Sequence, residues 1–213
     1  MDRSRLEAFS DGVFAVAITL LALNLTVKGP GLQHQLWEQR WSFGAYLISF
    51  AVIGIIWVNH HAVIKSIAKV DRTLLFLNLV LLLFVVLIPF STTTVAQYLP
   101  VGGPDVKVAM VLYSAVFLGM SAGFGLVFEW TLHGEHRIVP LPPQAHWPAR
   151  LRFVGGASVY VIAGVVSLFN AIIAFILIAL TAVYYIVERT PAVPAGADSP
   201  GDGAPVDGSQ HDQ

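Results

Sequence analysis

Polar and ionisable side chains lie inside three strongly apolar stretches of the sequence, where burial is costly. The first stretch carries Ser10 and Asp11, the second carries the run WVNHH at residues 57–61, and the third carries Asp71 and Asn78. An ionisable group in hydrocarbon usually faces protein or a water-filled cavity and pairs with another polar group. These residues therefore predict a buried polar network; the alternative is a set of helix-end charges solvated by lipid headgroups.

The partners of this network must come from different helices. Arg5 and Asp11 lie about 120° apart around a helix and one and a half turns apart along it, so they cannot readily satisfy each other. Each then needs partners at the same depth on the second and third stretches. The candidates there are Trp57, Asn59, His60, His61, Asp71 and Asn78. Such a network would hold three helices in one register.

The side of the first stretch opposite Asp11 carries a narrow aliphatic stripe. Val16, Leu20 and Leu23 lie within about 70° of one another around a helix, with Thr19 on the flank. By its pattern alone, such a stripe either faces lipid or packs against protein.

The elements that would position these residues are membrane-spanning helices. The chain is 56% hydrophobic and only 12% charged, and an apolar run of about 18 or more residues is long enough to cross a bilayer. We expect an all-α, polytopic membrane protein with a single transmembrane domain at residues 1–190. Its six predicted spans are residues 6–27, 43–65, 73–98, 106–131, 149–168 and 170–188.

The distribution of Lys and Arg predicts the orientation. Nine of the 12 lie at the ends and connections that share a side with the N-terminus, and three lie on the other side. We expect the protein to lie in the inner or plasma membrane of the cell. The positive-inside rule then places both of its termini in the cytoplasm. Residues 191–213 are rich in Pro, Gly, Ala and Asp and predict a disordered cytoplasmic tail.

Several classes of function are disfavoured. The sequence contains no cysteine, which excludes thiolate metal sites and thiol catalysis. Its net charge of -1 does not indicate a basic surface that would bind nucleic acid. The run HGEH at residues 133–136 does not match the H-E-x-x-H helix signature. We expect no catalytic residues, no cofactor and no metal site, although a metal-binding membrane enzyme or transporter remains an alternative.

A family resemblance rests on several motifs in order. Arg5-x-x-x-Phe9-Ser10-Asp11 is followed by WVNHH, then by DRTLLFLNL at residues 71–79 and PFSTT at residues 89–93. This order resembles the bacterial homologues of the lysosomal and endosomal potassium channel, whose first helix carries an Arg-x-x-x-Phe-Ser-Asp signature. The resemblance covers the first three helices by motif and the others by number and length.

The resemblance implies a potassium-selective, leak-type cation channel built from four copies of this chain. The first helix of each copy would line the pore, and the constriction positions carried over from the motif are Val16, Thr19 and Leu23, with Leu20 one step aside. Since Val16 is smaller than the Leu or Ile associated with the first of these positions, Leu20 or Leu23 would carry the gate.

No TVGYG-like loop is present in the sequence, so a carbonyl filter is not expected. A ring of aliphatic side chains would instead close the pore by dewetting. The partners implied are potassium ions, lipids and further copies of the chain. The remaining alternative is a non-conducting membrane scaffold or assembly protein, which would leave the motif of the first helix unexplained.

Overall fold

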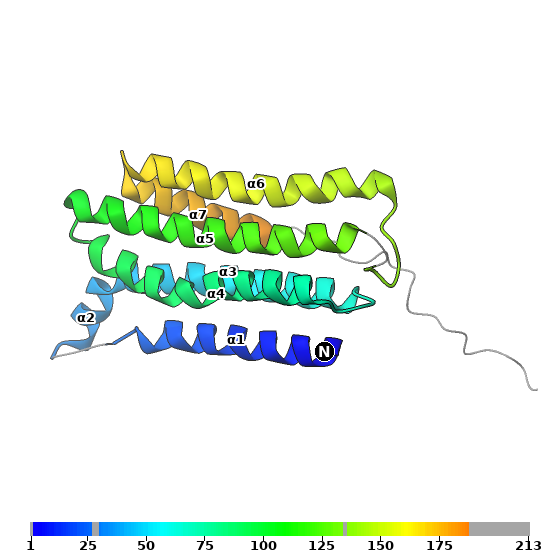
Figure 1. Ribbon diagram of the computed structural model, residues 1–213. Helices are drawn as coiled ribbons and strands as arrows, with labels where there is room; N and C mark the ends of the chain where they lie inside the picture. The colour runs from blue at the N-terminus through cyan, green and yellow to red at the C-terminus, as the bar shows by residue number, and fades with distance from the viewer. Residues whose placement is uncertain (1, 27–29, 134–135, 188–213) are drawn as a thin grey trace, which may run out of the picture.

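The protein is a bundle of long helices, as the computed structural model shows (Figure 1). The structure describes residues 2–26, 30–133 and 136–187. Within these ranges there is no β-strand, and a single antiparallel bridge joins Ile67 to Arg137. The seven helices of the described ranges are α1 (Arg3–Leu23), α2 (Leu32–Glu38), α3 (Arg40–Lys65), α4 (Arg72–Tyr98), α5 (Gly103–Leu132), α6 (Pro143–Ser167) and α7 (Ala171–Val187).

The expected all-α membrane architecture is confirmed. Five helices, namely α1, α3, α4, α5 and α6, are long and apolar enough to cross a membrane. The sixth predicted span corresponds to α7, which is apolar but has only 17 residues. The start of α1 and the described end of α7 point to the same end of the bundle (Figure 1), which is the arrangement that an even number of crossings requires.

Three features differ from the expected spans by more than three residues. Helix α1 ends at Leu23, four residues before the predicted end of the first span. The short helix α2 follows Gly31, which has a left-handed φ of 82°, and it occupies a segment expected to be a connection. Helix α6 begins at Pro143, six residues before the predicted start, and contains Pro148. Pro143 is tolerated because the backbone N–H groups of the first turn have no partner within the helix, whereas Pro148 lies inside the helix and removes one backbone donor.

The α6–α7 connection is as short as predicted. Only residues 168–170 separate the two helices. Asn170 begins α7 by accepting hydrogen bonds from the backbone N–H groups of Ile172 and Ile173, at 3.0 and 3.1 Å. This cap satisfies two donors that a helix N-terminus leaves unpaired.

Helices α4 and α5 pack closely through two glycines of α5. A Cβ atom at Gly119 would collide with the ring of Phe84, and one at Gly123 would lie 2.9 Å from Cα of Leu81. Both glycines therefore serve packing inside one subunit, which is the ordinary interpretation of a small-residue spacing of four.

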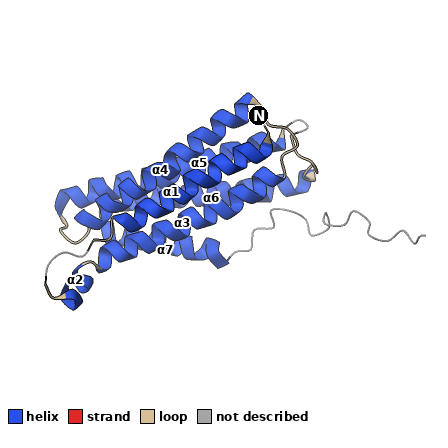
Figure 2. Cartoon of the chain, turned by 90° about the horizontal axis from the view of Figure 1, so that it is seen from below, coloured by secondary structure: helices blue, strands red, loops and turns tan. Residues whose placement is uncertain are grey.

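Helix α1 lies at the edge of the bundle, where it packs mainly against α3 and α4 (Figures 1 and 2). Its side chains that face them recur every three or four residues. These are Leu6, Ser10, Phe14, Ala17 and Leu21. Because only one face of α1 is covered, the opposite face is open in the single subunit.

Candidate functional site: the two faces of helix α1

The innermost part of the site is a hydrogen-bonded chain across three helices. Asn78 of α4 donates through Nδ2 to Ser10 Oγ of α1 at 3.0 Å, and its Oδ1 lies 2.8 Å from His60 Nε2 of α3. All three side chains are buried. Because an amide oxygen only accepts, the proton of the His60 ring belongs on Nε2. Nδ1 of His60 is left without a partner among the described residues.

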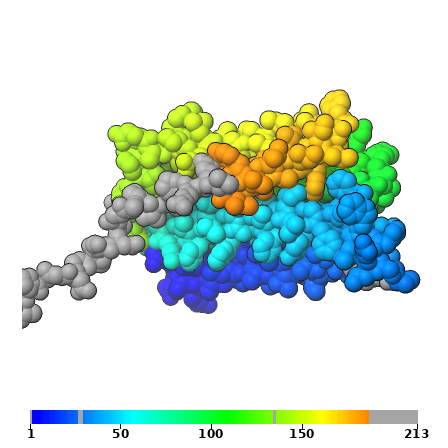
Figure 3. All heavy atoms as spheres, turned by 180° about the vertical axis from the view of Figure 1, so that it is seen from behind, coloured from blue at the N-terminus to red at the C-terminus, as the bar shows by residue number. Residues whose placement is uncertain are grey.

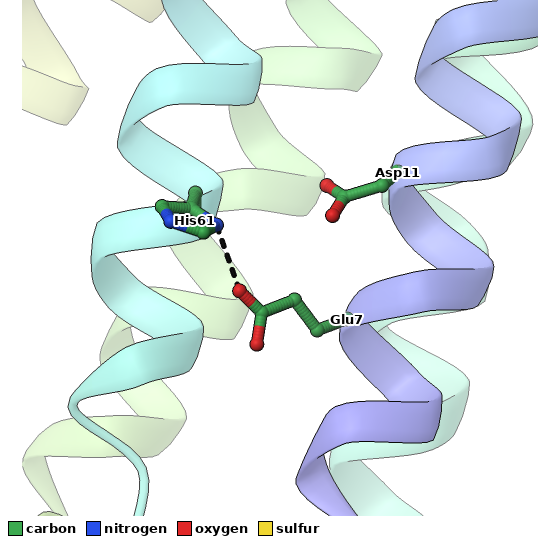
Figure 4. A group of neighbouring side chains, drawn as sticks. All are labelled: Glu7, Asp11 and His61. Atoms are coloured by element: carbon green, nitrogen blue, oxygen red, sulfur yellow. Dashed lines mark ion pairs between the residues drawn. The ribbon is translucent and has the colours of Figure 1, made fainter.

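A second set of contacts lies on the more exposed side of this chain. Trp57 Nε1 donates to Asp11 Oδ1 at 2.9 Å, and His61 Nδ1 lies 2.8 Å from Glu7 Oε1. Figure 4 shows Glu7 and Asp11 on α1 with His61 facing them from α3. The indole of Trp57 stacks near the His61 ring, with centroids 6.1 Å apart. Together the two sets of contacts connect α1 to both of its neighbours.

Sequence reasoning missed the partnership of Glu7 with His61. The available signal was spacing, because Glu7 lies four residues before Asp11 and so shares its face of the helix. It also missed Arg3, whose Nη1 donates to the carbonyl oxygens of Lys65 and Ile67 at 3.0 and 3.2 Å, at the C-terminal end of α3.

Four of the expected network residues lie elsewhere. Asp71 caps α4 by accepting from the backbone N–H of Leu74 at 2.7 Å. Asn59 donates to the carbonyl oxygen of Ile55 on its own helix. The Phe9 ring is 51% exposed, and the side chain of Arg5 forms no hydrogen bond or ion pair with any described residue.

One group of side chains has a donor set suitable for a metal. Glu7, Asp11 and His61 offer ligand atoms that all lie within 4.8 Å of one another, and zinc accepts both carboxylate and imidazole ligands. Each of the three already has a protein contact, to one another or to Trp57. The group is therefore complete as a set of contacts that holds α1 against α3.

The histidines of the HGEH run do not converge. His133 Nδ1 lies 2.8 Å from the carbonyl oxygen of Glu129, and His136 Nδ1 lies 2.9 Å from that of Trp130. The His136 ring also stacks on the indole of Trp130, with centroids 3.8 Å apart. These contacts fix both rings on α5; residues 134 and 135 lie outside the described ranges.

The other face of α1 carries the aliphatic stripe. Val16 is 56% exposed, Leu20 39% and Leu23 67%, and Thr19 is exposed beside them with its Oγ1 bonded to the carbonyl oxygen of Ala15 at 2.8 Å. Among the described residues, Val16 and Leu23 of this stripe are more than half exposed and Leu20 is partly covered. It can face lipid or the equivalent stripes of other copies.

Comparison with known sequences gives a consistent set of relatives. The sequence model of a family described as "Endosomal/lysosomal potassium channel TMEM175" matches residues 5–89. A protein of Streptomyces collinus named as a potassium channel is 38% identical over 204 residues, which cover 93% of this chain and 98% of that protein. The human protein named "Endosomal/lysosomal proton channel TMEM175" is 28% identical over 162 residues, which cover 70% of this chain and 32% of the human one.

Solved structures show the same fold. The crystal structure of a lysosomal potassium-selective channel TMEM175 homologue from Chamaesiphon minutus superposes with a TM-score of 0.75 at 30% identity. The superposition covers 86% of this chain and 96% of that structure. The likeness therefore extends over all but a small part of the bundle.

Proposed function

Since the chain belongs to the TMEM175 family of potassium channels, we propose that it conducts potassium ions through a pore lined by α1 in an assembly of four copies. The observation that carries this proposal is the exposed aliphatic stripe of α1, on a helix whose other face is fixed to α3 and α4. A helix that only needed to sit in lipid would not require buried polar bonds to fix its rotation.

The stripe would supply both the gate and the selectivity. Four copies of Leu20 or Leu23 facing one axis would close the pore by dewetting, with Val16 leaving a wider ring nearer the Asp11 end of α1. Four hydroxyls of Thr19 would offer weak, exchangeable ligands to a partly dehydrated cation. Because potassium sheds water more readily than sodium, this arrangement favours potassium without a tight binding site.

The polar contacts would set the rotation of α1. A turn of α1 that moved the stripe away from the axis would break the Ser10–Asn78 and Asp11–Trp57 bonds. Breaking a buried bond leaves its partner unsatisfied, at a cost of about 1 to 3 kcal/mol for each group. The Arg-x-x-x-Phe-Ser-Asp motif would thus act on conduction through the placement of α1.

The remaining features of the proposal follow from the charge pattern. Both termini would lie in the cytoplasm, and residues 1–190 would form the channel domain in the cell's inner or plasma membrane. Residues 191–213, predicted to be a cytoplasmic tail, lie outside the described ranges. The protein would act as a channel without catalytic residues, cofactor or bound metal.

Ion flux into proteoliposomes tests conduction. Vesicles containing the wild-type chain should take up potassium faster than sodium. Leu23→Ala should raise the potassium flux, because it widens a ring of the stripe, and Thr19→Ala should lower the preference for potassium. Leu83→Ala, at an exposed position of α4, is the matched control and should change neither.

The same vesicles should carry a pH-sensitive dye, because vertebrate relatives are named proton channels. A proton flux that exceeds the potassium flux would replace potassium as the proposed ion. If the wild-type chain and both stripe variants pass no ion while remaining stable oligomers, the scaffold alternative takes the place of the channel.

A further inference from the structure

A second site lies away from α1, in a largely apolar cavity of about 140 Å³ between α3, α5, α6 and α7. Its walls are mainly aliphatic and aromatic. They include Ile55 and Ile56 of α3, Phe124 and Phe128 of α5, and Phe153 of α6. At the end of the bundle where α1 begins, Arg137 and Arg152 also line it. The cavity thus combines an apolar interior with cationic groups at one end.

Helix α6 is longer than the described part of α7. The two helices are joined by a short link, and α6 has 25 residues whereas α7 has 17. The difference of eight residues corresponds to about 12 Å of helix. Figure 3 shows α6 extending beyond the described end of α7. Of the described α7 side chains, Ala182 and Tyr185 line the cavity.

Arg137 has donors that the described chain does not use. Its Nη1 donates to Thr131 Oγ1 at 3.1 Å, but its Nε is buried without a hydrogen-bond partner, and no described carboxylate forms an ion pair with it. Burial lowers the pKa of this guanidinium. Arg137 is half-buried, and a buried N–H donor of a guanidinium is costly to leave without an acceptor, so this arginine favours an anionic ligand.

We propose that the cavity binds an anionic phospholipid, with part of one acyl chain between α3 and α6 and the phosphate held by Arg137. Basic pockets between transmembrane helices bind anionic lipid headgroups, and the planar guanidinium suits phosphate oxygens. The cavity-lining residues of α3 run from Val52 to Val63, which is about 16 Å of helix. This length accommodates an extended segment of acyl chain below a headgroup at the bundle end.

A phospholipid fits the site better than a free anion or a purely apolar molecule. A free anion would leave the aromatic walls without an occupant, and an apolar molecule would leave Arg137 Nε unpaired. The lipid would join the connection between α5 and α6 to α3, on the side of the bundle remote from the stripe of α1. This inference goes beyond conduction and does not depend on it.

Native mass spectrometry of the purified full-length protein tests the site. The probes are phosphatidylglycerol, phosphatidylcholine with the same acyl chains, and free oleate, each added to delipidated protein. The variants are Arg137→Gln, which removes the charge, and Ser121→Leu, which fills the cavity from α5 and leaves the charge in place. Lys69→Gln is the control, because it removes an exposed cation that does not line the cavity.

We expect the wild-type chain and Lys69→Gln to retain phosphatidylglycerol in preference to phosphatidylcholine. Arg137→Gln should weaken phosphatidylglycerol binding about tenfold, the usual effect of losing one charge-assisted contact. Ser121→Leu should weaken it as well and keep the melting temperature of the wild-type protein. The second variant keeps the proposal testable if Arg137→Gln fails to fold.

Three results would overturn the proposal. Equal retention of both phospholipids would remove the role of the headgroup charge. Retention of oleate without phosphatidylglycerol would make a single-chain carboxylate the ligand. An unchanged affinity in both variants, or no lipid on the wild-type chain, would leave the cavity without a lipid. Since every readout is binding, these results are independent of whether the protein conducts.

Discussion

The two faces of α1 differ in how much of their surface is buried by other helices of the same subunit. On one face Ser10 and Phe14 are buried against α3 and α4, and hydrogen bonds cross to both neighbours. On the other face Val16 and Leu23 are 56% and 67% exposed among the described residues. The first face fixes the position of the helix, whereas the second is available to whatever lies beside it. Substitutions on the two faces should therefore be separable by measurement, with stability reporting one and ion flux the other.

The largest expected effect compares two phenylalanines of α1. Phe14 is 1% exposed and Phe9 is 51% exposed. Phe14→Ala should lower the free energy of unfolding by about 3 to 5 kcal/mol, because it leaves a cavity in the core. Phe9→Ala should change it by about 0.5 kcal/mol. Thermal unfolding of the solubilised protein followed by circular dichroism gives both values. Similar losses of stability at the two positions would contradict this expected difference and show that Phe9 is covered in the assembly.

A smaller effect compares two asparagines in the same polar region. Asn78→Ala removes a side chain that contacts both Ser10 and His60, and it should cost about 2 kcal/mol because two buried groups lose their partner. Asn59→Ala removes only a bond within α3 and should cost less than about 1 kcal/mol. Equal losses of stability in the two variants would mean that the hydrogen bonds from Asn78 to Ser10 and His60 stabilise the protein no more than a bond within one helix does.

A third pair examines the Asp11–Trp57 bond from both ends. Asp11→Asn keeps an acceptor but removes its charge, and Trp57→Phe removes the donor. Each should lower the free energy of unfolding by about 1 kcal/mol, because a charge-assisted bond is lost or weakened. The double variant should cost less than the sum of the single ones, since both changes remove the same interaction. Strict additivity in that cycle would show that the bond is absent in the membrane.

The smallest expected change in stability is on the open face. Thr19→Val should alter the free energy of unfolding by no more than about 0.5 kcal/mol, because Thr19 Oγ1 bonds only a carbonyl of its own helix. The ratio of potassium to sodium flux should nevertheless fall. A stable variant with an unchanged ratio of potassium to sodium flux would show that this face of α1 does not contact ions.

Hydropathy and helical periodicity predicted most of the membrane-spanning helices, and the elements that they missed have identifiable causes. The apolar runs placed five spans, because length and composition alone decide whether a helix can cross a membrane. They missed α2, which is too short and too polar to register as a span. They also placed the start of α6 too late, because Pro143 in the first turn and Pro148 inside the helix look the same in sequence as prolines in a loop.

The polar site was harder to predict in detail. Depth along the helices brought Asp11 and Trp57 to the same level, but it could not separate Asn78, which reaches across to α1, from Asn59, which turns back onto α3. Asp71 was grouped with the network although its position just before α4 is that of an N-cap. Which partner a polar side chain selects depends on helix rotation, and the rotation is set by packing that a single sequence does not display.

In mechanical terms, Gly119 and Gly123 let α4 and α5 interlock. The Phe84 ring and the backbone of Leu81 occupy the space that a Cβ at these glycines would take, so sliding one helix along the other would bring larger α5 residues against them. In the proposed channel, we would therefore expect a change in pore width to come from a tilt or rotation of α1 against α4 and α5. Such a motion would strain the hydrogen bond from Asn78 of α4 to Ser10 of α1.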